Sequence, residues 1–266
     1  SKVASVNTYG KITAKKAGSA TITAKTKNAE ASCKVTVTKT KVTLNKTSLT
    51  LENGESAVLT AASSTGHKVT WKSAKTSIAS VSENGKVTAK KPGTTTVTAK
   101  VDGTSVNCKV TVKSPTVRLT PSKISLYRKE KYNLKVSSTS KSTPVWKTNK
   151  KSVATVDETG KVTAVKHGTA VITVTVDGVS KNCEVTVRSP KITFEQTTIT
   201  LQPGERARVN ATVSSGNQPA YSCSNANVVS VDANGVITAK TAGRSYVYAS
   251  EDGTKERMTV YVKEKE

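Results

Sequence analysis

The stretch that decides the fold is residues 69–103, VTWKSAKTSIASVSENGKVTAKKPGTTTVTAKVDG. Its later part, NGKVTAKKPGTTTVTAKVDG around Gly85, recurs as TGKVTAVKHGTAVITVTVDG around Gly160 and as NGVITAKTAGRSYVYASEDG around Gly235. A shorter copy, YGKITAKKAGSATITAK, surrounds Gly10, and neighbouring copies lie 75 residues apart. A fixed period of this length predicts a tandem array of similar modules.

The repeat divides the 266 residues into three full modules and one partial module. The same spacing of 75 residues links Trp71, Trp146 and Tyr221. The predicted full modules cover residues 40–114, 115–189 and 190–266, preceded by the second half of a module in residues 1–39. We expect this half module to be part of a longer polypeptide. The alternative is a module that strands of another chain complete.

Within each module, apolar and polar residues alternate between turn residues, which predicts short β-strands. For the module 40–114, the expected strands are 41–44, 47–52, 56–61, 68–72, 77–81, 86–90, 94–101 and 104–112. The Asp-Gly pair at 102–103 predicts a two-residue hairpin in which Val97 faces Cys108 on the inside. Thr96 then faces Lys109 on the outside. The fold class is therefore all-β, with small two-sheet sandwiches of the immunoglobulin kind.

The phrase at 69–103, with its Trp, its IASV, its GKVTA and its later glycine, resembles the bacterial immunoglobulin-like group 2 family, and all three full modules carry the phrase. The resemblance implies an extracellular sandwich of the kind found in surface proteins, in adhesins such as intimin and invasin, and in accessory regions of secreted enzymes. It implies no particular ligand. We therefore expect an extracellular protein, either on a bacterial cell surface or secreted.

The charge balance favours an anionic partner. Lys and Arg number 42 against 18 Asp and Glu, which gives a formal net charge of +24. The lysines recur singly at alternate strand positions and aromatic residues make up only 4%, a pattern that argues against nucleic acid. An anionic cell-wall polymer or an acidic glycan is the better candidate. The basic excess fades in residues 190–266, which hold nine Lys and Arg against eight Asp and Glu.

No pattern of catalytic, cofactor-binding or metal-binding residues stands out. His67 and His167 lie in predicted exposed loops at positions that are not equivalent in the repeat, without a carboxylate or Cys pattern around them. Four cysteines form neither a disulfide framework nor a close metal-binding cluster. The sequence contains no run of about 18 apolar residues, so it predicts no membrane-spanning helix. We therefore expect a non-catalytic protein without cofactor, metal site or transmembrane segment.

Cysteine and aspartate residues also recur at equivalent positions of the repeat. The alternation of apolar and polar residues predicts that three cysteines point into the core as small apolar side chains: Cys33, Cys108 and Cys183. Cys223 stands where the other full modules have Ser73 and Thr148, so it is the candidate for a reactive thiol. An aspartate precedes Gly in each predicted hairpin, where turn chemistry explains it better than calcium ligation. These aspartates are Asp102, Asp177 and Asp252.

The first candidate binding site is a set of aromatic and basic residues in the last module. Tyrosines replace the outward threonines that the module 40–114 has at the same repeat positions, and they are Tyr246, Tyr248 and Tyr261. The predicted hairpin places Arg244 opposite Tyr261 and Arg257 opposite Tyr248. An exposed face of this kind is a candidate for binding a glycan. Alternatively, these cross-strand pairs only stabilise the sheet.

The second candidate is a basic and aromatic patch at the position where the other full modules have Asn-Gly or Pro-Gly. It consists of Tyr127, Arg128, Lys129, Lys131 and Tyr132. This patch is a candidate for contacting an acidic polymer. The alternative interpretation is an altered turn.

The leading functional hypothesis is a stalk or spacer. The connections between predicted modules are very short and carry Pro115 and Pro190 at equivalent positions, which limits bending. Such a stalk would hold neighbouring domains of a longer chain away from the cell wall, or attach them to it through wall polymer. The alternatives are an adhesin or glycan-binding module acting through the Tyr and Arg face, an accessory region of a secreted glycan-active enzyme, and a subunit of an extracellular fibre completed by strand exchange.

Overall fold

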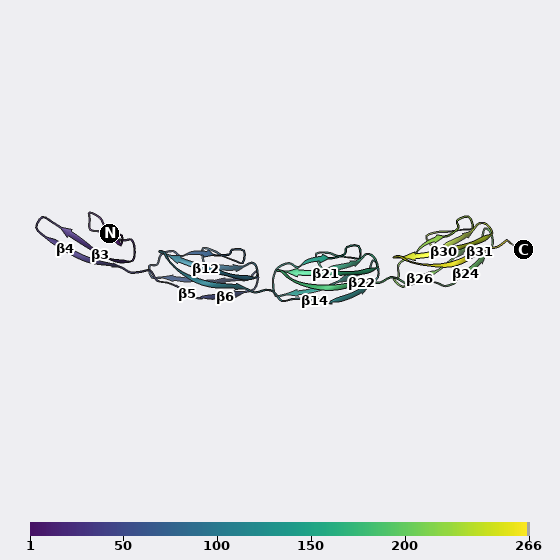
Figure 1. The fold of residues 1–266 in the computed structure, drawn as a ribbon, viewed down its shortest axis with the longest axis horizontal. Coiled ribbons are helices and arrows are strands. Elements are labelled where there is room, and N and C mark those ends of the chain that lie inside the picture. Colours follow the sequence, from purple (N-terminus) through teal and green to yellow (C-terminus); the bar gives the residue numbers. More distant parts are fainter. Residues whose placement is uncertain (265–266) are drawn as a thin grey trace. The chain divides into compact units, whose positions relative to one another are not determined.

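A computed structural model describes residues 1–264, so the last two residues of the predicted module 190–266 lie outside the described part. The described chain contains 31 strands (Figure 1). It contains no helix long and apolar enough to cross a membrane. The chain forms two compact units: the first comprises 1–116 with 139–142, and the second comprises 117–138 with 143–266. Strands β1–β13 belong to the first unit and β14–β31 to the second.

The first unit begins with two strand pairs. Their strands are β1 (Ala4–Val6), β2 (Ile12–Ala14), β3 (Gly18–Lys25) and β4 (Glu30–Val37). β1 pairs only with β2, and β3 pairs only with β4, among the strands of residues 1–264. Cys33 on β4 is exposed, so the prediction that it points into a core is wrong. The reason is that no second sheet covers the β3–β4 hairpin in the described chain.

The rest of the first unit is a complete sandwich, here called sandwich A. Its strands are β5 (Val42–Leu44), β6 (Ser48–Leu51), β7 (Ser56–Val58), β8 (Ala61–Ser63), β9 (Thr70–Ser73), β10 (Ala79–Val81), β11 (Lys86–Ala89), β12 (Gly93–Val101) and β13 (Thr104–Val112). One layer is a four-stranded sheet of order β6-β13-β12-β9, in which β6 runs parallel to β13. The three-stranded sheet β10-β11-β7 and the pair β5-β8 form the other layer.

The hairpin of β12 and β13 has the register that alternation predicts. Val97 pairs with Cys108 and Thr96 pairs with Lys109. Val97 and Cys108 are both fully buried between the two layers. Asp102 in the turn has a φ of 48°, as a tight Asp-Gly hairpin requires. The predicted turn role of this aspartate is confirmed.

One predicted strand of sandwich A is in fact two. The segment expected as a single strand at 56–61 forms β7, which pairs with β11, and β8, which pairs with β5. Between them, Leu59 is buried, and its N–H donates to the carbonyl of Gly85 at 2.9 Å. The chain therefore changes from one sheet to another at Leu59, which the alternating pattern does not reveal.

The second unit contains two further sandwiches with the same strand order. Sandwich B consists of β14 (Val117–Thr120), β15 (Lys123–Leu126), β16 (Lys131–Asn133), β17 (Lys135–Ser138), β18 (Val145–Thr148), β19 (Ala154–Val156), β20 (Lys161–Ala164), β21 (Gly168–Val176) and β22 (Val179–Val187). Sandwich C consists of β23 (Ile192–Phe194), β24 (Thr198–Leu201), β25 (Arg206–Arg208), β26 (Ala211–Val213), β27 (Ala220–Cys223), β28 (Val229–Val231), β29 (Val236–Ala239), β30 (Gly243–Glu251) and β31 (Thr254–Val262). Pro190, in the short segment between β22 and β23, is buried.

Each complete sandwich has a core of mostly small apolar side chains. In sandwich C, the fully buried residues include Val247 on β30 and Met258 on β31, which lie opposite each other. Their neighbours along each strand point to the outer face of the sheet β24-β31-β30-β27. The hydrophobic alternation thus fixes which side chains of the last hairpin are presented outward.

Candidate functional site

The outer face of the β30–β31 hairpin carries the Tyr and Arg residues predicted to form a ladder. Arg244 pairs with Tyr261, and Tyr248 pairs with Arg257. Tyr246, between them on β30, pairs with Thr259. Tyr261 is 37% exposed. The sheet therefore brings together all five residues of the first candidate site.

The aromatic rings of this face are stacked against cations. The guanidinium Cζ of Arg257 lies 4.4 Å from the ring centroid of Tyr246, and that of Arg244 lies 5.4 Å from the same centroid. Lys255, which the sequence analysis did not include, places its Nζ 3.8 Å from the centroid of Tyr248. Cation–π contacts of this length are attractive and hold the cations in place. We call the face formed by Arg244, Tyr246, Tyr248, Lys255, Arg257 and Tyr261 the Tyr–cation face.

The second candidate patch is divided by the fold. Tyr127 stacks with the guanidinium of Arg188 at 4.0 Å. Lys129 has a φ of 72° at the position where the other complete sandwiches have Gly54 and Gly204. Lys131 and Tyr132 lie on β16 and are exposed, so a loose basic and aromatic surface remains there. The turn is therefore the same as in the other sandwiches, with Lys129 in place of a glycine, and the contact of this patch with an acidic polymer stays a prediction.

Arg128 makes a different contact from the one expected. Its Nε donates to Oε1 of Glu251 at 2.6 Å, and its Nη2 forms an ion pair with the same oxygen at 2.6 Å. Asn217 Nδ2 donates to the same oxygen at 3.2 Å and to the carbonyl oxygen of Arg128 at 3.0 Å, while Ser215 Oγ donates to Oε2 at 3.2 Å. The Glu251 side chain is only 1% exposed. A buried carboxylate of sandwich C is thus satisfied by a cation of sandwich B, within the second unit.

His167 and Asp252 form a second contact between the same two sandwiches. The backbone N–H of His167 donates to Oδ2 of Asp252 at 2.7 Å, and its Nδ1 lies 3.4 Å from Oδ1. The Asp252 side chain is 2% exposed and that of His167 is 38% exposed. His167 is therefore only partly exposed, with its Nδ1 buried near Asp252, so the prediction of an exposed loop histidine holds only in part. We call the set Arg128, Glu251, Asn217, Ser215, His167 and Asp252 the joint cluster.

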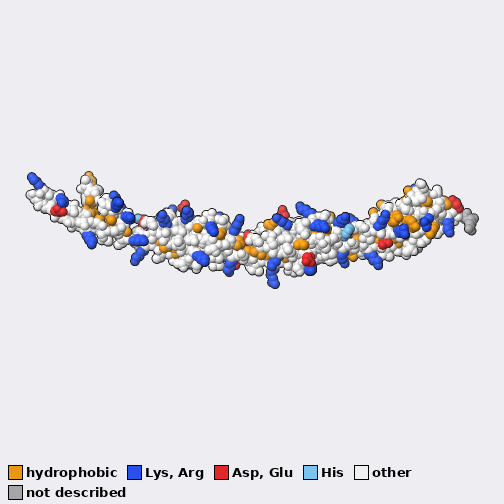
Figure 2. Space-filling view, in the orientation of Figure 1, with side chains coloured by type: hydrophobic (Ala, Val, Ile, Leu, Met, Phe, Trp, Pro, Cys, Tyr) orange, Lys and Arg blue, Asp and Glu red, His pale blue; other side chains and the backbone are white. Residues whose placement is uncertain are grey.

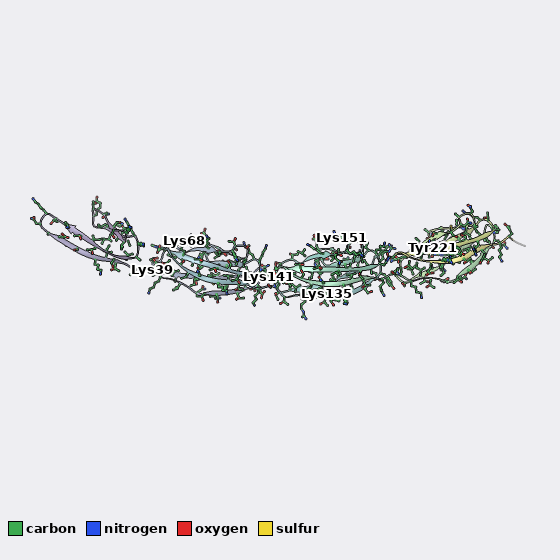
Figure 3. All side chains as sticks on the ribbon, in the orientation of Figure 1. Lys39, Lys68, Lys135, Lys141, Lys151 and Tyr221 are labelled. Carbon is green, nitrogen blue, oxygen red and sulfur yellow. The ribbon has the colours of Figure 1, made fainter. Side chains whose placement is uncertain are left out.

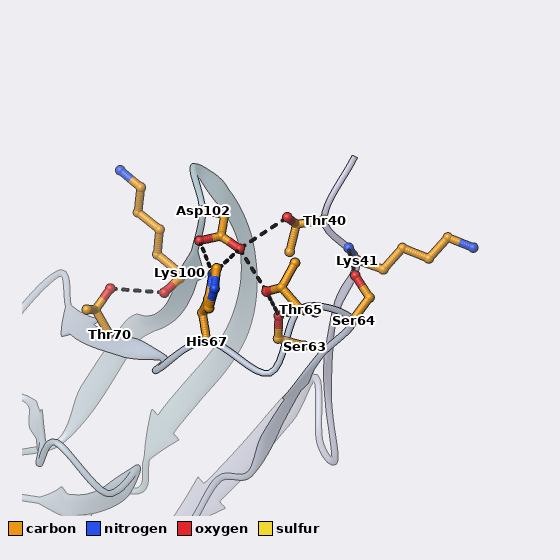
Figure 4. Close-up of polar contacts among 9 residues, drawn as sticks. All are labelled: Thr40, Lys41, Ser63, Ser64, Thr65, His67, Thr70, Lys100 and Asp102. Carbon is orange, nitrogen blue, oxygen red and sulfur yellow. Dashed lines mark hydrogen bonds and ion pairs between the residues drawn. The ribbon is translucent and has the colours of Figure 1, made fainter. Parts of the chain in front are cut away.

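In the first unit, Asp102 accepts hydrogen bonds from three neighbouring side chains (Figure 4). His67 Nδ1 lies 2.9 Å from Oδ1, while Thr65 Oγ1 and Thr40 Oγ1 donate to Oδ2 at 2.8 and 3.3 Å. The hydrogen bond from His67, followed by that from Thr65, lowers the pKa of Asp102. His67 is exposed, as predicted, but its carboxylate partner was missed because the two residues are 35 positions apart.

Catalysis of the serine-hydrolase kind requires a hydroxyl or thiol in hydrogen-bond contact with the second ring nitrogen of the histidine. Among the hydrogen bonds of residues 1–264, none joins a hydroxyl or thiol to Nε2 of His67. In the same part of the chain, no group of three or more His, Cys, Asp or Glu side chains is placed to hold a metal ion.

The cysteines divide into buried and accessible thiols. Cys108 and Cys183 are fully buried, as predicted, and burial raises the pKa of both thiols. Cys223 is partly buried, and its Sγ–H donates to the carbonyl of Val229 at 3.2 Å. Ser73 makes the equivalent bond to Ala79 at 2.6 Å in sandwich A. Cys223 thus takes over a structural hydrogen bond, and its reactivity stays a prediction.

The lysines are distributed as single exposed side chains. Figure 2 shows basic side chains scattered over the face in view, with fewer acidic ones between them. Five lysines labelled in Figure 3 illustrate this distribution, since each is exposed. They are Lys39, Lys68, Lys135, Lys141 and Lys151. The positive charge is therefore spread out, and the Tyr–cation face combines several cations with aromatic rings on one sheet.

Comparison with known proteins identifies the modules. The bacterial Ig-like domain (group 2) matches residues 38–114 and 112–187. The chain belongs to this family. Sandwiches A and B of this group 2 protein are the matched modules, and sandwich C repeats their strand order and register. The predicted fold class, tandem immunoglobulin-like sandwiches with a period of 75 residues, is confirmed.

Relatives of this group 2 protein include an uncharacterized protein of Clostridium acetobutylicum, 35% identical over 135 residues. The match covers 46% of this chain and 14% of that protein, so the chain spans a small part of its relative. The I9–I11 tandem of titin is 14% identical with a TM-score of 0.49 over 85% of this chain and all of that structure. Invasin, a bacterial integrin-binding protein, is 15% identical with a TM-score of 0.32 over 94% of this chain and 66% of that structure.

Proposed function

We propose that the chain is a non-catalytic extracellular spacer within a bacterial surface or secreted protein. The observation that carries this proposal is the joint cluster. The buried carboxylate of Glu251 on one sandwich accepts a hydrogen bond from Arg128 Nε and forms an ion pair with Arg128 Nη2 on the preceding sandwich. A buried charge that depends on a neighbouring module makes independent movement of the two modules costly. Repeats that contact only their sequence neighbours are suited to holding other domains apart.

The spacer proposal is tested by the dimensions of the chain in solution. Strands of about eight residues rise about 3.3 Å per residue, so three and a half modules arranged end to end span on the order of 100 Å. We expect small-angle X-ray scattering of the full chain to give a maximum dimension of this order. A compact particle, with a maximum dimension about half as large, would contradict the proposal.

We further propose that the spacer associates with an anionic cell-wall polymer. The net charge of +24 and the scattered exposed lysines support this. Interactions between exposed charges are screened by salt, with a Debye length of about 10 Å at 0.1 M ionic strength. Retention on purified cell wall should therefore decrease steeply as salt is added. Retention that is independent of ionic strength would count against an electrostatic association.

A second candidate function is glycan binding by the Tyr–cation face. The observation that favours it is the placement of Tyr246, Tyr248 and Tyr261 together on one exposed sheet face, at positions where sandwich A has threonines. The alternative is a purely stabilising role, since cross-strand pairs contribute about 0.2–1 kcal/mol each. Binding should be lost in the double variant Tyr246→Ala and Tyr248→Ala. The matched control is Tyr9→Ala in the first unit, which removes an exposed tyrosine outside both candidate sites.

Neighbouring domains of a longer polypeptide are the partners that a spacer requires. The Clostridium acetobutylicum relative is much longer than the matched segment, which supports this expectation. An accessory region of a secreted enzyme would have the same sandwiches and differ in the attached domain. Intact-mass analysis of the native protein distinguishes these settings, because each predicts a different attached domain.

A further inference from the structure

The Tyr–cation face differs in charge from the equivalent face of the other sandwiches. The positions of Arg244, Lys255 and Arg257 are held by Thr94, Ser105 and Asn107 in sandwich A, and by Thr169, Ser180 and Asn182 in sandwich B. Three cations and three tyrosines therefore occur together in one sandwich. This happens in residues 190–266, where the basic excess is smallest. The cations of this face are thus concentrated in a module whose overall charge is nearly balanced.

The cations of this face are not neutralised by carboxylates. Among the ion pairs of the described chain, none involves Arg244, Lys255 or Arg257. Glu256 lies between Lys255 and Arg257 in sequence but pairs with the core residue Ala249, and alternation directs it to the other side of the strand. The guanidinium groups therefore keep their hydrogen-bond donors available to a ligand.

The stacking determines what kind of ligand the rings can receive. A neutral sugar packs its apolar face on the open face of an aromatic ring. Here Arg257 and Arg244 lie 4.4 and 5.4 Å from the centroid of Tyr246, and Lys255 lies 3.8 Å from that of Tyr248. The rings of Tyr246 and Tyr248 act as supports that fix the cations. The guanidinium group binds carboxylates and phosphates through paired N–H donors, so the fixed groups suit an acidic ligand.

We propose that the Tyr–cation face binds an acidic polymer, through the carboxylate or phosphate groups that repeat along a glycan or polyol chain. This proposal rests on the second candidate function and gives its ligand class. Residues two apart on a strand lie about 6.6 Å apart and neighbouring strands about 4.8 Å apart, so the cations form a flat array. A linear polyanion lying along β30 and β31 meets Lys255, Arg257 and Arg244 in turn.

The test uses the full chain and three defined polymers: polygalacturonate as the carboxylate probe, poly(glycerol phosphate) as the phosphate probe, and neutral dextran. Affinity is measured by isothermal titration calorimetry at 0.1 M salt. The variant is Arg244→Gln with Arg257→Gln. The matched control is Arg206→Gln with Arg208→Gln, which removes the same charge from exposed positions on β25, in the other layer of sandwich C.

We expect at least one of the two acidic polymers to bind. The face variant should weaken that binding on the order of tenfold, because it removes two charge-assisted contacts, and the control should weaken it less than about twofold. The acidic polymer that binds more tightly shows whether the face prefers carboxylate or phosphate groups. Equal weakening by both variants overturns the proposal, because the binding would then follow net charge alone.

Two further outcomes separate this proposal from the others. Binding of dextran as tightly as the acidic polymers, with loss in the double variant Tyr246→Ala and Tyr248→Ala, overturns the acidic ligand class but keeps glycan binding. Absence of binding to all three polymers overturns both proposals for the face. The spacer proposal is unaffected by either result, because it depends on the dimensions of the chain.

Discussion

The indole of Trp71 lies directly against Gly85: a Cβ built on Gly85 would be 3.0 Å from the indole Cζ2 and would collide with the carbonyl oxygen of Leu59. The glycine of the repeated GKVTA phrase is therefore a packing requirement of sandwich A. Gly160 has the same relation to Trp146 at 2.6 Å, and Gly235 to Tyr221 at 3.1 Å. The aromatic residue and the glycine recur together because the aromatic ring occupies the space that a Cβ on the glycine would need.

The first prediction concerns this contact. Gly85→Ala should lower the free energy of unfolding of sandwich A by about 2–4 kcal/mol, because a methyl group is forced into occupied space and onto a φ of 74°. The control is Gly103→Ala, which has a φ of 80° but no atom within 4 Å of the added Cβ, and should cost about 1 kcal/mol. Denaturant unfolding followed by Trp71 fluorescence, in a Trp146→Phe background, measures both. Equal losses would show that the backbone angle alone matters.

The strand register was predictable because it depends on neighbouring residues. Alternation of apolar and polar side chains determines which face each residue occupies, and the Asp-Gly turn sets the pairing of Val97 with Cys108. The same logic correctly placed Arg244 opposite Tyr261. It failed at Leu59, where the chain moves from one sheet to another, because a period of two does not specify which sheet a strand joins.

The polar contacts were harder to predict, since they join residues far apart in sequence. Arg128 and Glu251 are 123 positions apart, and His67 and Asp102 are 35 apart. One signal was available: Glu251 stands where the other complete sandwiches have Val101 and Val176. A carboxylate at a core position requires a partner. The identity of that partner needs the three-dimensional arrangement.

The second prediction tests that partnership. Arg128→Gln should destabilise the β30–β31 hairpin by about 1–3 kcal/mol, because the carboxylate of Glu251 loses its cation while remaining buried. Solvent screening limits the loss, since Arg128 is 31% exposed. Adding Glu251→Val, which restores the residue of the other sandwiches, should recover most of this loss. Hydrogen-exchange mass spectrometry of peptides from residues 243–262 measures the local stability. A double variant as unstable as Arg128→Gln alone would refute the role of the buried charge.

The third prediction concerns the thiols. Burial raises the pKa of Cys108 and Cys183, so little reactive thiolate forms at pH 8 in the folded protein. Iodoacetamide should modify the exposed Cys33 and leave Cys108 and Cys183 unmodified until denaturant is added, as peptide mass spectrometry can show. Because the folded pKa of Cys108 is raised above its ordinary value of 9.0, the protonated thiol favours the folded state fully at pH values below 9.0. This part of the free energy of unfolding is lost as the pH rises above 9.0 toward the folded pKa. Labelling of Cys108 at the rate of Cys33 would contradict its burial.

The last prediction concerns the carboxylate of Asp102. His67 contributes most to lowering its pKa and Thr65 contributes next, so the carboxylate should titrate below its ordinary value of 3.8. A lowered folded pKa stabilises the turn above the ordinary value, and this contribution is lost as the pH falls through the folded pKa. His67→Ala should therefore raise the titration midpoint of Asp102 more than Thr65→Val does, as carbon-detected NMR of the aspartate carboxyl groups can measure. Because the pair is exposed, added salt should reduce the ionic part of the His67 effect and leave the hydrogen bond from Thr65 nearly unchanged. A midpoint that is the same in all three proteins would show that neither side chain acts on this carboxylate in solution.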